Sequence, residues 1–341
     1  MKPKRTLIAL VVLAGLAVVS GGGWWMAPSV SGQSLTPVTM APDFLPGGNH
    51  AFMYAARELG YYKQEGLDVQ IVHVGGASAA QQSLIAGKAQ FAYTDFATMA
   101  VTRQKQSTDV QAVMGVQQQT AMAVLSPASK NIAKPADLPG KHIVDFAGSS
   151  TQTIWPVFLK INNLVAPQIK MDLVDPSARL SLVVQGKADG AIAFYTDNLP
   201  VLKSQCNCEV NALTWKDFGI RLMGSGIVTR ASYAAQNAKV VGGFVRASQR
   251  GFQYCGTQPQ ECAELMAKGL PNARLNPSLL QQTITMSFQQ LARTLANARE
   301  PLGFMARADW AATAELMEQA GALKPGYSVE EFYTNQFIPK S

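Results

Sequence analysis

The chain has 341 residues, of which 48% are hydrophobic and 15% are charged, and this composition is typical of a globular protein of about two domains. Its formal net charge of +7 includes Lys2, Lys4 and Arg5 at the N-terminus, and the remaining excess is small and scattered. A nucleic-acid interface is therefore excluded, because it needs clustered basic residues. The three histidines are not spaced as metal ligands, so we expect no metal or cofactor.

Residues 1–35 are predicted to be a signal peptide or an N-terminal anchor. Lys2, Lys4 and Arg5 precede an uninterrupted apolar run over residues 6–19, as in an export signal. Small residues at 30–32 offer a cleavage site, whereas Trp24 and Trp25 suit the interface position of an uncleaved anchor. Both outcomes remain open, and either places the rest of the protein in the periplasm.

The first half of the chain contains an alternating series of strands and helices. Strands are predicted over 37–44, 66–74 and 91–95, where β-branched and apolar residues gather. Helices are predicted over 50–60 and 77–86, the second closed by Gly87. This order is a βαβαβ unit, which forms a mainly parallel sheet.

A second unit repeats the first in order and spacing. Strands are predicted over 141–146, 169–174 and 191–197, and helices over 151–164 and 178–185, followed by Gly186. The ends of the two units nearly match: Gly-Lys-Ala-Gln at 87–90 and Tyr-Thr-Asp at 93–95 correspond to Gly-Lys-Ala-Asp at 186–189 and Tyr-Thr-Asp at 195–197. The sequence therefore predicts an α/β protein with two similar lobes.

The segments around the second unit set the predicted domain boundaries. Residues 120–125 and 219–229 cross between the units and are expected to form a two-stranded hinge. Lobe I is predicted over 36–121, lobe II over 122–224, and a helical return to lobe I over 225–341. In such sheets ligands bind beyond the carboxyl ends of the strands, so the cleft between the lobes is the expected site.

The four cysteines are consistent with an oxidising compartment. Cys255 and Cys262 flank a predicted turn between two helices and are expected to form a disulfide. Cys206 and Cys208 are separated by one residue and would close only a strained small ring. A metal-binding cysteine cluster is the less favoured alternative, because no histidine accompanies it.

Polar and aromatic residues follow the predicted strands of both units and are the candidate ligand contacts. Asn49 and His50 begin a helix, and Gly76, Ala77 and Ser78 form a glycine turn into the next one. The full set is Asp43, Phe44, Asn49, His50, Gly76, Ala77, Ser78, Thr94, Asp95, Gln118, Ser149, Ser150, Thr151, Trp155, Tyr195 and Asp197. The competing interpretation is structural: serines and aspartates that cap helices or turns, and aromatics that pack in the core.

One alternative is catalytic. The run Gly76-Ala-Ser78-Ala-Ala80 resembles a nucleophile elbow, but it lacks the final glycine. A hydrolase would also need a histidine later in the chain than Ser78. The only such histidine is His142, which lies on a predicted strand. The sequence therefore favours a binding protein over a hydrolase.

Two longer stretches resemble a known family. The run from Asp43 to Ala51 with Gly60-Tyr-Tyr-Lys-Gln-Glu-Gly-Leu-Asp-Val69 resembles the opening of periplasmic solute-binding proteins of ABC importers. The branch is the one for thiamine-precursor pyrimidines, riboflavin-like compounds, alkyl sulfonates and nitrate. Pro135-Ala-Asp-Leu-Pro-Gly-Lys141 and Asp189-Gly-Ala-Ile-Ala193 are similar to later parts of that family. The resemblance covers about residues 37–250.

The resemblance implies a two-lobed periplasmic-binding-protein fold of type II and no enzymatic activity. It implies a small-molecule ligand and an inner-membrane ABC permease as partners, with the binding protein acting as a monomer. The aspartates and aromatics at the strand ends favour a pyrimidine, thiamine precursor or flavin-like heterocycle. The first alternative is a protein of the same fold that binds alkyl sulfonate, taurine or nitrate. The second alternative is a pyrimidine-forming enzyme or a tethered sensor domain.

Overall fold

The computed structural model describes residues 34–340. The predicted signal or anchor over residues 1–35 therefore lies, apart from its last two residues, outside the described residues. Within the part that is described, no helix is long and apolar enough to cross a membrane.

Residues 35–340 form one compact unit that contains two five-stranded sheets, each with helices packed on it. The first sheet, in lobe I, has the order β2-β1-β3-β10-β4, and the second, in lobe II, has the order β7-β6-β8-β5-β9. The strands are β1 (Thr36–Pro42), β2 (Leu67–Ile71), β3 (Phe91–Asp95), β4 (Val110–Gly115), β5 (Met122–Pro127), β6 (His142–Asp145), β7 (Lys170–Leu173), β8 (Gly190–Phe194), β9 (Val210–Thr214) and β10 (Ser225–Arg230).

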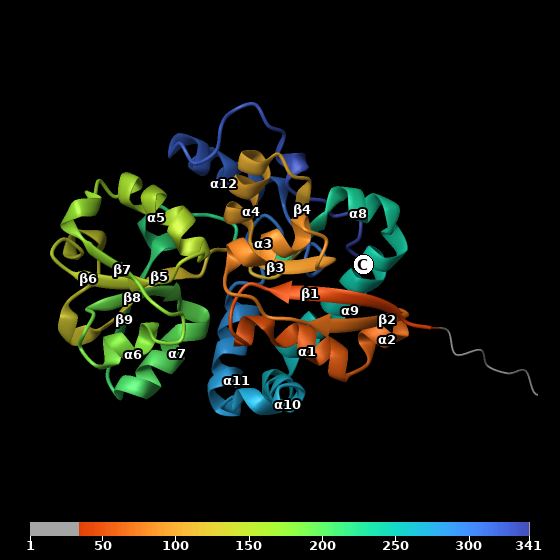
Figure 1. Ribbon diagram of the computed structural model, residues 1–341, viewed down its shortest axis with the longest axis horizontal. Coiled ribbons are helices and arrows are strands. Elements are labelled where there is room, and N and C mark those ends of the chain that lie inside the picture. The colour runs from red at the N-terminus through yellow and green to blue at the C-terminus, as the bar shows by residue number, and fades with distance from the viewer. Residues whose placement is uncertain (1–33, 341) are drawn as a thin grey trace, which may run out of the picture. The chain divides into compact units, whose positions relative to one another are not determined.

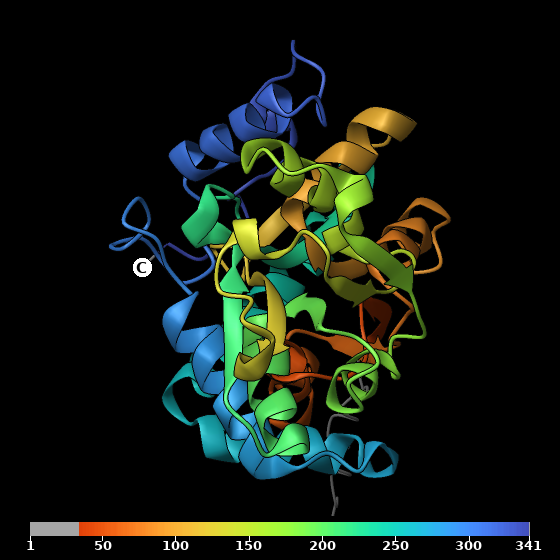
Figure 2. The ribbon, with the colours of Figure 1, turned by 90° about the vertical axis from the view of Figure 1, so that its left-hand side faces the viewer.

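The helices occupy the connections between these strands and the C-terminal third. They are α1 (Ala51–Glu58), α2 (Tyr61–Gln64), α3 (Ala77–Ile85), α4 (Phe96–Gln106), α5 (Ser150–Ile161), α6 (Arg179–Val184), α7 (Tyr195–Cys206), α8 (Ala231–Gln236), α9 (Ala238–Thr257), α10 (Pro259–Gly269), α11 (Pro277–Thr285) and α12 (Arg307–Gln319). At lobe I, α12 lies at one end and α10 and α11 at the opposite end in both views (Figures 1 and 2).

The predicted repeat is visible in the sheet order. In lobe I the strands β2, β1 and β3 are parallel neighbours, and in lobe II β7, β6 and β8 are parallel neighbours in the same order. Each sheet contains one strand that runs against the others: β10 in lobe I and β5 in lobe II. Gly87 and Gly186 follow α3 and α6 with φ of +70° and +71°, the left-handed conformation expected after a helix. The α/β two-lobed prediction is confirmed.

The crossings between the sheets lie side by side. Val116 N donates to Ser225 O at 3.0 Å, Ser225 N to Gln117 O at 3.0 Å and Thr120 N to Leu222 O at 3.0 Å. The two segments pair through their backbones, as a hinge requires, but the predicted hinge strands over 120–125 and 219–229 were wrong in their bounds. Residues 122–125 belong to β5 of the second sheet and residues 225–229 to β10 of the first, and the crossings at 116–121 and 219–224 form no regular strand. Gly224 is needed here, because a β-carbon would lie 2.6 Å from Gln117 O.

The C-terminal helices complete lobe I and reach the other lobe. Helix α9 packs along α1, α10 packs on α1 and α9, and α11 contacts α7 of lobe II. Their buried side chains join the lobe I core with those of β1, β3 and α1, for example Phe52, Phe244 and Phe252. Residues 225–340 therefore contribute β10, a cover for the sheet, and a segment next to the cleft.

The structure pairs Cys255 with Cys262, as predicted. This disulfide joins the last turn of α9 to the first turn of α10. It also pairs Cys206 with Cys208 and so closes the small ring described above. That ring lies at the C-terminal end of α7.

Candidate functional site

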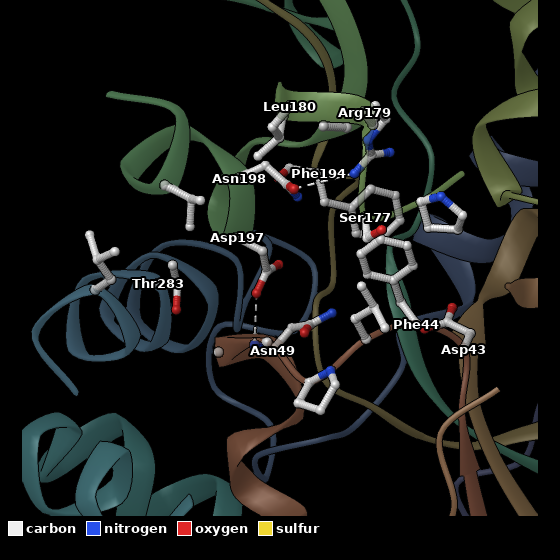
Figure 3. A pocket seen from close by; sticks show the side chains of 18 of the residues that line it. Asp43, Phe44, Asn49, Ser177, Arg179, Leu180, Phe194, Asp197, Asn198 and Thr283 are labelled. Carbon is white, nitrogen blue, oxygen red and sulfur yellow. Dashed lines mark hydrogen bonds between the residues drawn. The ribbon is translucent and has the colours of Figure 1, made fainter. Parts of the chain in front are cut away.

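A cavity of about 360 Å³ lies between the two lobes at the carboxyl ends of β1, β6 and β8. This volume is in the range of small-molecule sites. Figure 3 shows side chains from both lobes and from α11 converging on it. Its lining consists of residues 43–49, Ala77, Phe146, residues 149–151, Pro176, Ser177, Arg179, Leu180, Ala193, Phe194, Asp197, Asn198, Val201, Gln205, residues 274–276, Leu279, Leu280 and Thr283.

Half of the predicted contacts lie in this lining. They are Asp43, Phe44 and Asn49 from the loop after β1, Ala77 at the start of α3, Ser149, Ser150 and Thr151 at the start of α5, and Asp197 in the first turn of α7. All of them lie in the loops or helix starts that follow strands, because the parallel strands bring their carboxyl ends to the cleft.

An aromatic pair crosses the cleft. The ring of Phe44, from lobe I, lies 5.1 Å from the ring of Phe146, from lobe II, with 34° between their planes. The Arg179 guanidinium carbon lies 5.5 Å and 5.3 Å from the two ring centroids. Phe194 is a third aromatic residue of the lining. A flat ring of a ligand would find apolar π surfaces from both lobes here.

Arg179 is the buried cation of the cavity wall, and its charge is already matched. Its Nη1 donates to Ile192 O at 2.8 Å and lies 3.8 Å from Asp145 Oδ1, and its Nη2 donates to Asn198 Oδ1 at 3.2 Å. Burial lowers the pKa of Arg179 to about 10, so it stays protonated at neutral pH. Asp145, next to it, also accepts from the hydroxyls of Ser149 and Thr151.

Asp43 brings a carboxylate to the lobe I wall without a charged partner. His50 Nε2 lies 3.5 Å from Asp43 Oδ1, and both side chains are buried. Burial raises the pKa of Asp43 to about 7 and lowers the pKa of His50 to about 3. His50 is therefore neutral at physiological pH and cannot neutralise Asp43 by charge.

Asp197 brings a second carboxylate, from lobe II. Its Oδ1 accepts from Asn49 N at 3.0 Å across the cleft, and its Oδ2 accepts from Thr196 Oγ1 at 2.9 Å (Figure 3). Burial, with a smaller contribution from the nearby Asp43, raises the pKa of Asp197 to about 6. Two acids on opposite walls make the cavity receptive to N–H donors of a ligand.

The start of α5 forms a donor-rich part of the lobe II wall. Ser149 caps the helix by accepting from Gln152 N at 3.3 Å and donates its own hydroxyl to Asp145 Oδ2 at 2.9 Å. Ser149 thus has the capping role predicted by the structural interpretation, together with a place in the lining. These two roles are compatible, because the cap uses the side chain and leaves first-turn backbone N–H groups free.

The wall contributed by residues 274–283 was not predicted. Leu279, Leu280 and Thr283 of α11 face the loop after β1, and Arg274 lies exposed at the rim. Gly48 is required at this contact, since a β-carbon there would collide with the Thr283 side chain. The sequence predicted only a helical return to lobe I over 225–341 and gave no reason to place residues 274–283 at the cleft.

Four of the predicted contacts in lobe I are buried behind the lining. His50 lies behind Asp43, and Thr94 and Asp95 are fully buried. Asp95 Oδ1 accepts from Thr98 N at 2.8 Å and so caps α4. Gln118, in the hinge, donates from its Nε2 to Phe304 O at 3.1 Å. These side chains support the lobe and its hinge rather than line the cavity.

The remaining predicted contacts belong to lobe closure or to the core of lobe II. Ser78 N donates to Gly148 O at 3.4 Å, and Gly76 lies so close to Gly148 that a β-carbon would be 2.6 Å from its carbonyl oxygen. Trp155 stacks on Phe158, with ring centroids 5.3 Å apart. Tyr195 is packed in the lobe II core.

The raised pKa values predict how the stability of the unliganded protein depends on pH. Asp43 and Asp95 have a folded pKa of about 7, above the ordinary value of 3.8, so their contribution to stability falls as the pH rises through 7. Burial lowers the folded pKa of His50 and His73 to about 3, below the ordinary value of 6.5, so their opposing contribution still grows between pH 6.5 and about 7.5 and offsets part of this loss. Between pH 6.5 and 8 we therefore expect the free energy of unfolding to fall by about 1 kcal/mol.

Urea unfolding at several pH values measures this change. Asp95→Asn keeps an oxygen that can accept from Thr98 N, and it is expected to remove most of the decrease. A stability that rises from pH 6.5 to 8 would contradict the burial of two high-pKa carboxyls.

Comparison with known proteins identifies one matching family and two relatives of this chain. The family described as "NMT1/THI5 like" matches residues 48–262. The riboflavin-binding protein RibY of Chloroflexus aurantiacus is 27% identical over 318 residues, which cover 92% of this chain and 89% of RibY. The formylaminopyrimidine-binding protein of Halalkalibacterium halodurans is 24% identical over 282 residues, covering 82% of this chain and 83% of the relative.

A solved structure shares the fold. The alkanesulfonate-binding protein SsuA from Xanthomonas axonopodis pv. citri, bound to MOPS, superposes with a TM-score of 0.66 at 15% identity. The superposition covers 88% of this chain and 98% of SsuA. At this identity the match shows a common two-lobed architecture.

Proposed function

Because the chain belongs to the NMT1/THI5-like family, we propose that it is the substrate-binding component of an ABC importer. It captures a small organic molecule in the cavity between its lobes and delivers it to a membrane permease. The match covers residues 48–262 and so includes both lobes and the hinge. The cationic and apolar N-terminal sequence supports export to the periplasm, where the protein acts as a monomer.

The ligand we propose is a flat nitrogen heterocycle, either a pyrimidine of the thiamine-precursor type or a flavin-like compound. The observation that carries this proposal is the placement of Asp43 and Asp197 in the same cavity as the Phe44–Phe146 pair. The rings supply stacking surface and the carboxylates accept from ring or amino N–H groups. Both relatives described above are named for ligands of this chemical class.

A binder of alkyl sulfonate, taurine or nitrate is the second candidate. It is favoured by the shared fold with an alkanesulfonate-binding protein and by the donor groups at the start of α5. It is opposed by the two carboxylates of the lining, since a buried anion needs donors and no facing acids. Arg179 does not offset them, because Asp145 lies 3.8 Å from its Nη1.

An enzyme or a tethered sensor on this fold is the third candidate. A pyrimidine-forming enzyme would need a reactive histidine and cysteine set. In the described residues Cys206, Cys208, Cys255 and Cys262 are paired as disulfides, and His142 contacts Asp172 rather than Ser78. We therefore propose a binding role without catalysis. Mass spectrometry of the exported protein distinguishes a carrier from a tethered sensor by the loss or retention of residues 1–32.

Isothermal titration of the purified protein tests the ligand class. One series contains riboflavin and 4-amino-5-hydroxymethyl-2-methylpyrimidine, and the other contains methanesulfonate, taurine and nitrate. We expect binding to at least one heterocycle, with a rise in melting temperature at saturating ligand. Binding confined to the anion series would replace the proposed ligand with the second candidate. Turnover of a bound heterocycle would contradict the assignment as a carrier.

A further inference from the structure

The carboxylate of Asp197 occupies the backbone donors at the start of the α1 region. Residues 48–50 form a short 3₁₀ turn that leads directly into α1. Asp197 Oδ1 accepts from Asn49 N at 3.0 Å, and Gly47 approaches so closely that a β-carbon there would lie 3.1 Å from the same oxygen. An acid of lobe II therefore binds the main chain of lobe I (Figure 3).

Such donors are where an external anion would bind. The first N–H groups of a helix lack partners within the helix and attract negative charge. Here the protein supplies that charge itself, from the facing wall of the same cavity. Thr196 Oγ1 donates to the second oxygen of Asp197 at 2.9 Å and so helps to orient the carboxylate.

The charges around this contact are unfavourable for a second anion. Asp43 lies on the lobe I wall, and its neighbour His50 is neutral. The buried cation of the wall, Arg179, is paired with Asp145, and Arg274 lies exposed at the rim. A sulfonate or nitrate in the cavity would therefore meet two acids, with the donors at Asn49 already in use.

We propose that Asp197 is a specificity-determining residue, which excludes anionic ligands by occupying an anion position with its own carboxylate. The same contact joins the two lobes across the cleft, so Asp197 also favours the closed arrangement of the empty protein. The anion-excluding role rests on the proposed binding function, whereas the contribution to closure can be measured without any ligand.

Two substitutions at this position separate charge from contact. Asp197→Asn keeps an oxygen that can accept from Asn49 N but removes the negative charge. Asp197→Ala removes both and frees the donors. Asp172→Asn is the matched control, because Asp172 is an acid of lobe II that pairs with His142 and Lys170 outside the cavity lining.

Titration with methanesulfonate and nitrate measures the anion affinity of the full chain and its variants. We expect Asp197→Asn and Asp197→Ala each to strengthen the binding of at least one anion by tenfold or more over the wild type and Asp172→Asn. For the empty Asp197→Ala variant, small-angle X-ray scattering is expected to give a larger radius of gyration than for the wild type. The alanine variant's circular dichroism spectrum shows whether it folds, and the nearly isosteric asparagine variant gives the anion result independently.

Unchanged anion affinity in both folded variants overturns the proposal. An anion affinity that rises equally in Asp172→Asn also overturns it, because net charge would then explain the gain. The titrations of the wild type with riboflavin and the aminopyrimidine test the proposed ligand class independently of Asp197. If they fail while the Asp197 variants gain an anion, the proposed ligand is wrong and the role of Asp197 stands.

Discussion

Replacing Phe44 with alanine is expected to weaken binding of the heterocycle by about tenfold to a hundredfold while the protein remains folded. Phe44 faces Phe146 across the cleft and is only partly buried, so its ring serves the cavity more than the core. Stacking of a base on an aromatic side chain contributes about 1–3 kcal/mol, which sets the size of the effect. Isothermal titration with whichever heterocycle binds the wild type measures it.

Two neighbouring substitutions serve as controls. Phe44→Leu keeps apolar volume but removes the π surface, and it is expected to retain an intermediate affinity. Leu45 lies beside Phe44 in the same lining and is 50% exposed, so Leu45→Ala is expected to change the affinity less than threefold. Equal losses for Phe44→Ala and Leu45→Ala would show that apolar area rather than stacking is recognised.

Replacing Gly251 with alanine is expected to lower the free energy of unfolding by about 3 kcal/mol, since a close helix contact has no room for a methyl group. Gly251 lies in α9 where that helix crosses α1. A β-carbon there would collide with the carbonyl oxygen of Phe52 and lie 2.9 Å from the β-carbon of Ala56. Backbone atoms cannot move aside as a flexible side chain can, so the two helices must separate.

Gly256 provides the matched control in the same helix. A β-carbon at Gly256 meets no atom within 4 Å, and alanine favours a helix over glycine. Gly256→Ala is therefore expected to leave stability unchanged or to raise it by about 0.5–1 kcal/mol. Urea unfolding of the two variants compares them directly. A similar loss of stability in both variants would mean that the contact between α9 and α1 is not the cause of the loss.

The fold could be predicted because local patterns repeat. Two βαβαβ units of matching length, the second helix of each ended by glycine, predict a mainly parallel sheet in each lobe, since parallel strands need right-handed helical crossovers. The existence of two crossings could be predicted from the segments that leave and re-enter the first unit, but their positions were predicted a few residues too late in the chain, at 120–125 and 219–229. The strand that runs against the others in each sheet was not predicted, because pairing partners that are distant in sequence leave no local signal.

The repeated Tyr-Thr-Asp motif shows where prediction of the site failed. In lobe I the motif ends β3, so Asp95 becomes the cap of α4 and is buried. In lobe II β8 ends at Phe194, and the same three residues begin α7, which turns Asp197 toward the cleft. A difference of three residues in where the strand ends gives identical side chains different surroundings, and composition does not reveal that shift.

The wall formed by α11 and the contact at Phe146 were not predicted, and Trp155 was wrongly predicted to line the cavity, for another reason. Trp155 stacks on Phe158, one turn along the same helix, and Phe146 lies at the cleft. An aromatic residue near a strand end can face the core or the cavity, and the side is decided by packing across the fold. Residues 274–283 come to the cleft only through the packing of α10 and α11 at the end of lobe I.

The paired crossings at residues 116–121 and 219–224 make lobe II a single continuous insertion in the sequence of lobe I. Gln117 and Ser225 exchange backbone hydrogen bonds of 2.8 Å and 3.0 Å, so the chain leaves lobe I and returns to it at one place. All strands of the second sheet come from residues 122–214. The gene thus encodes the whole second sheet as one uninterrupted segment. Exchanging this segment between homologues would replace the lobe II wall of the cavity and leave the lobe I wall unchanged.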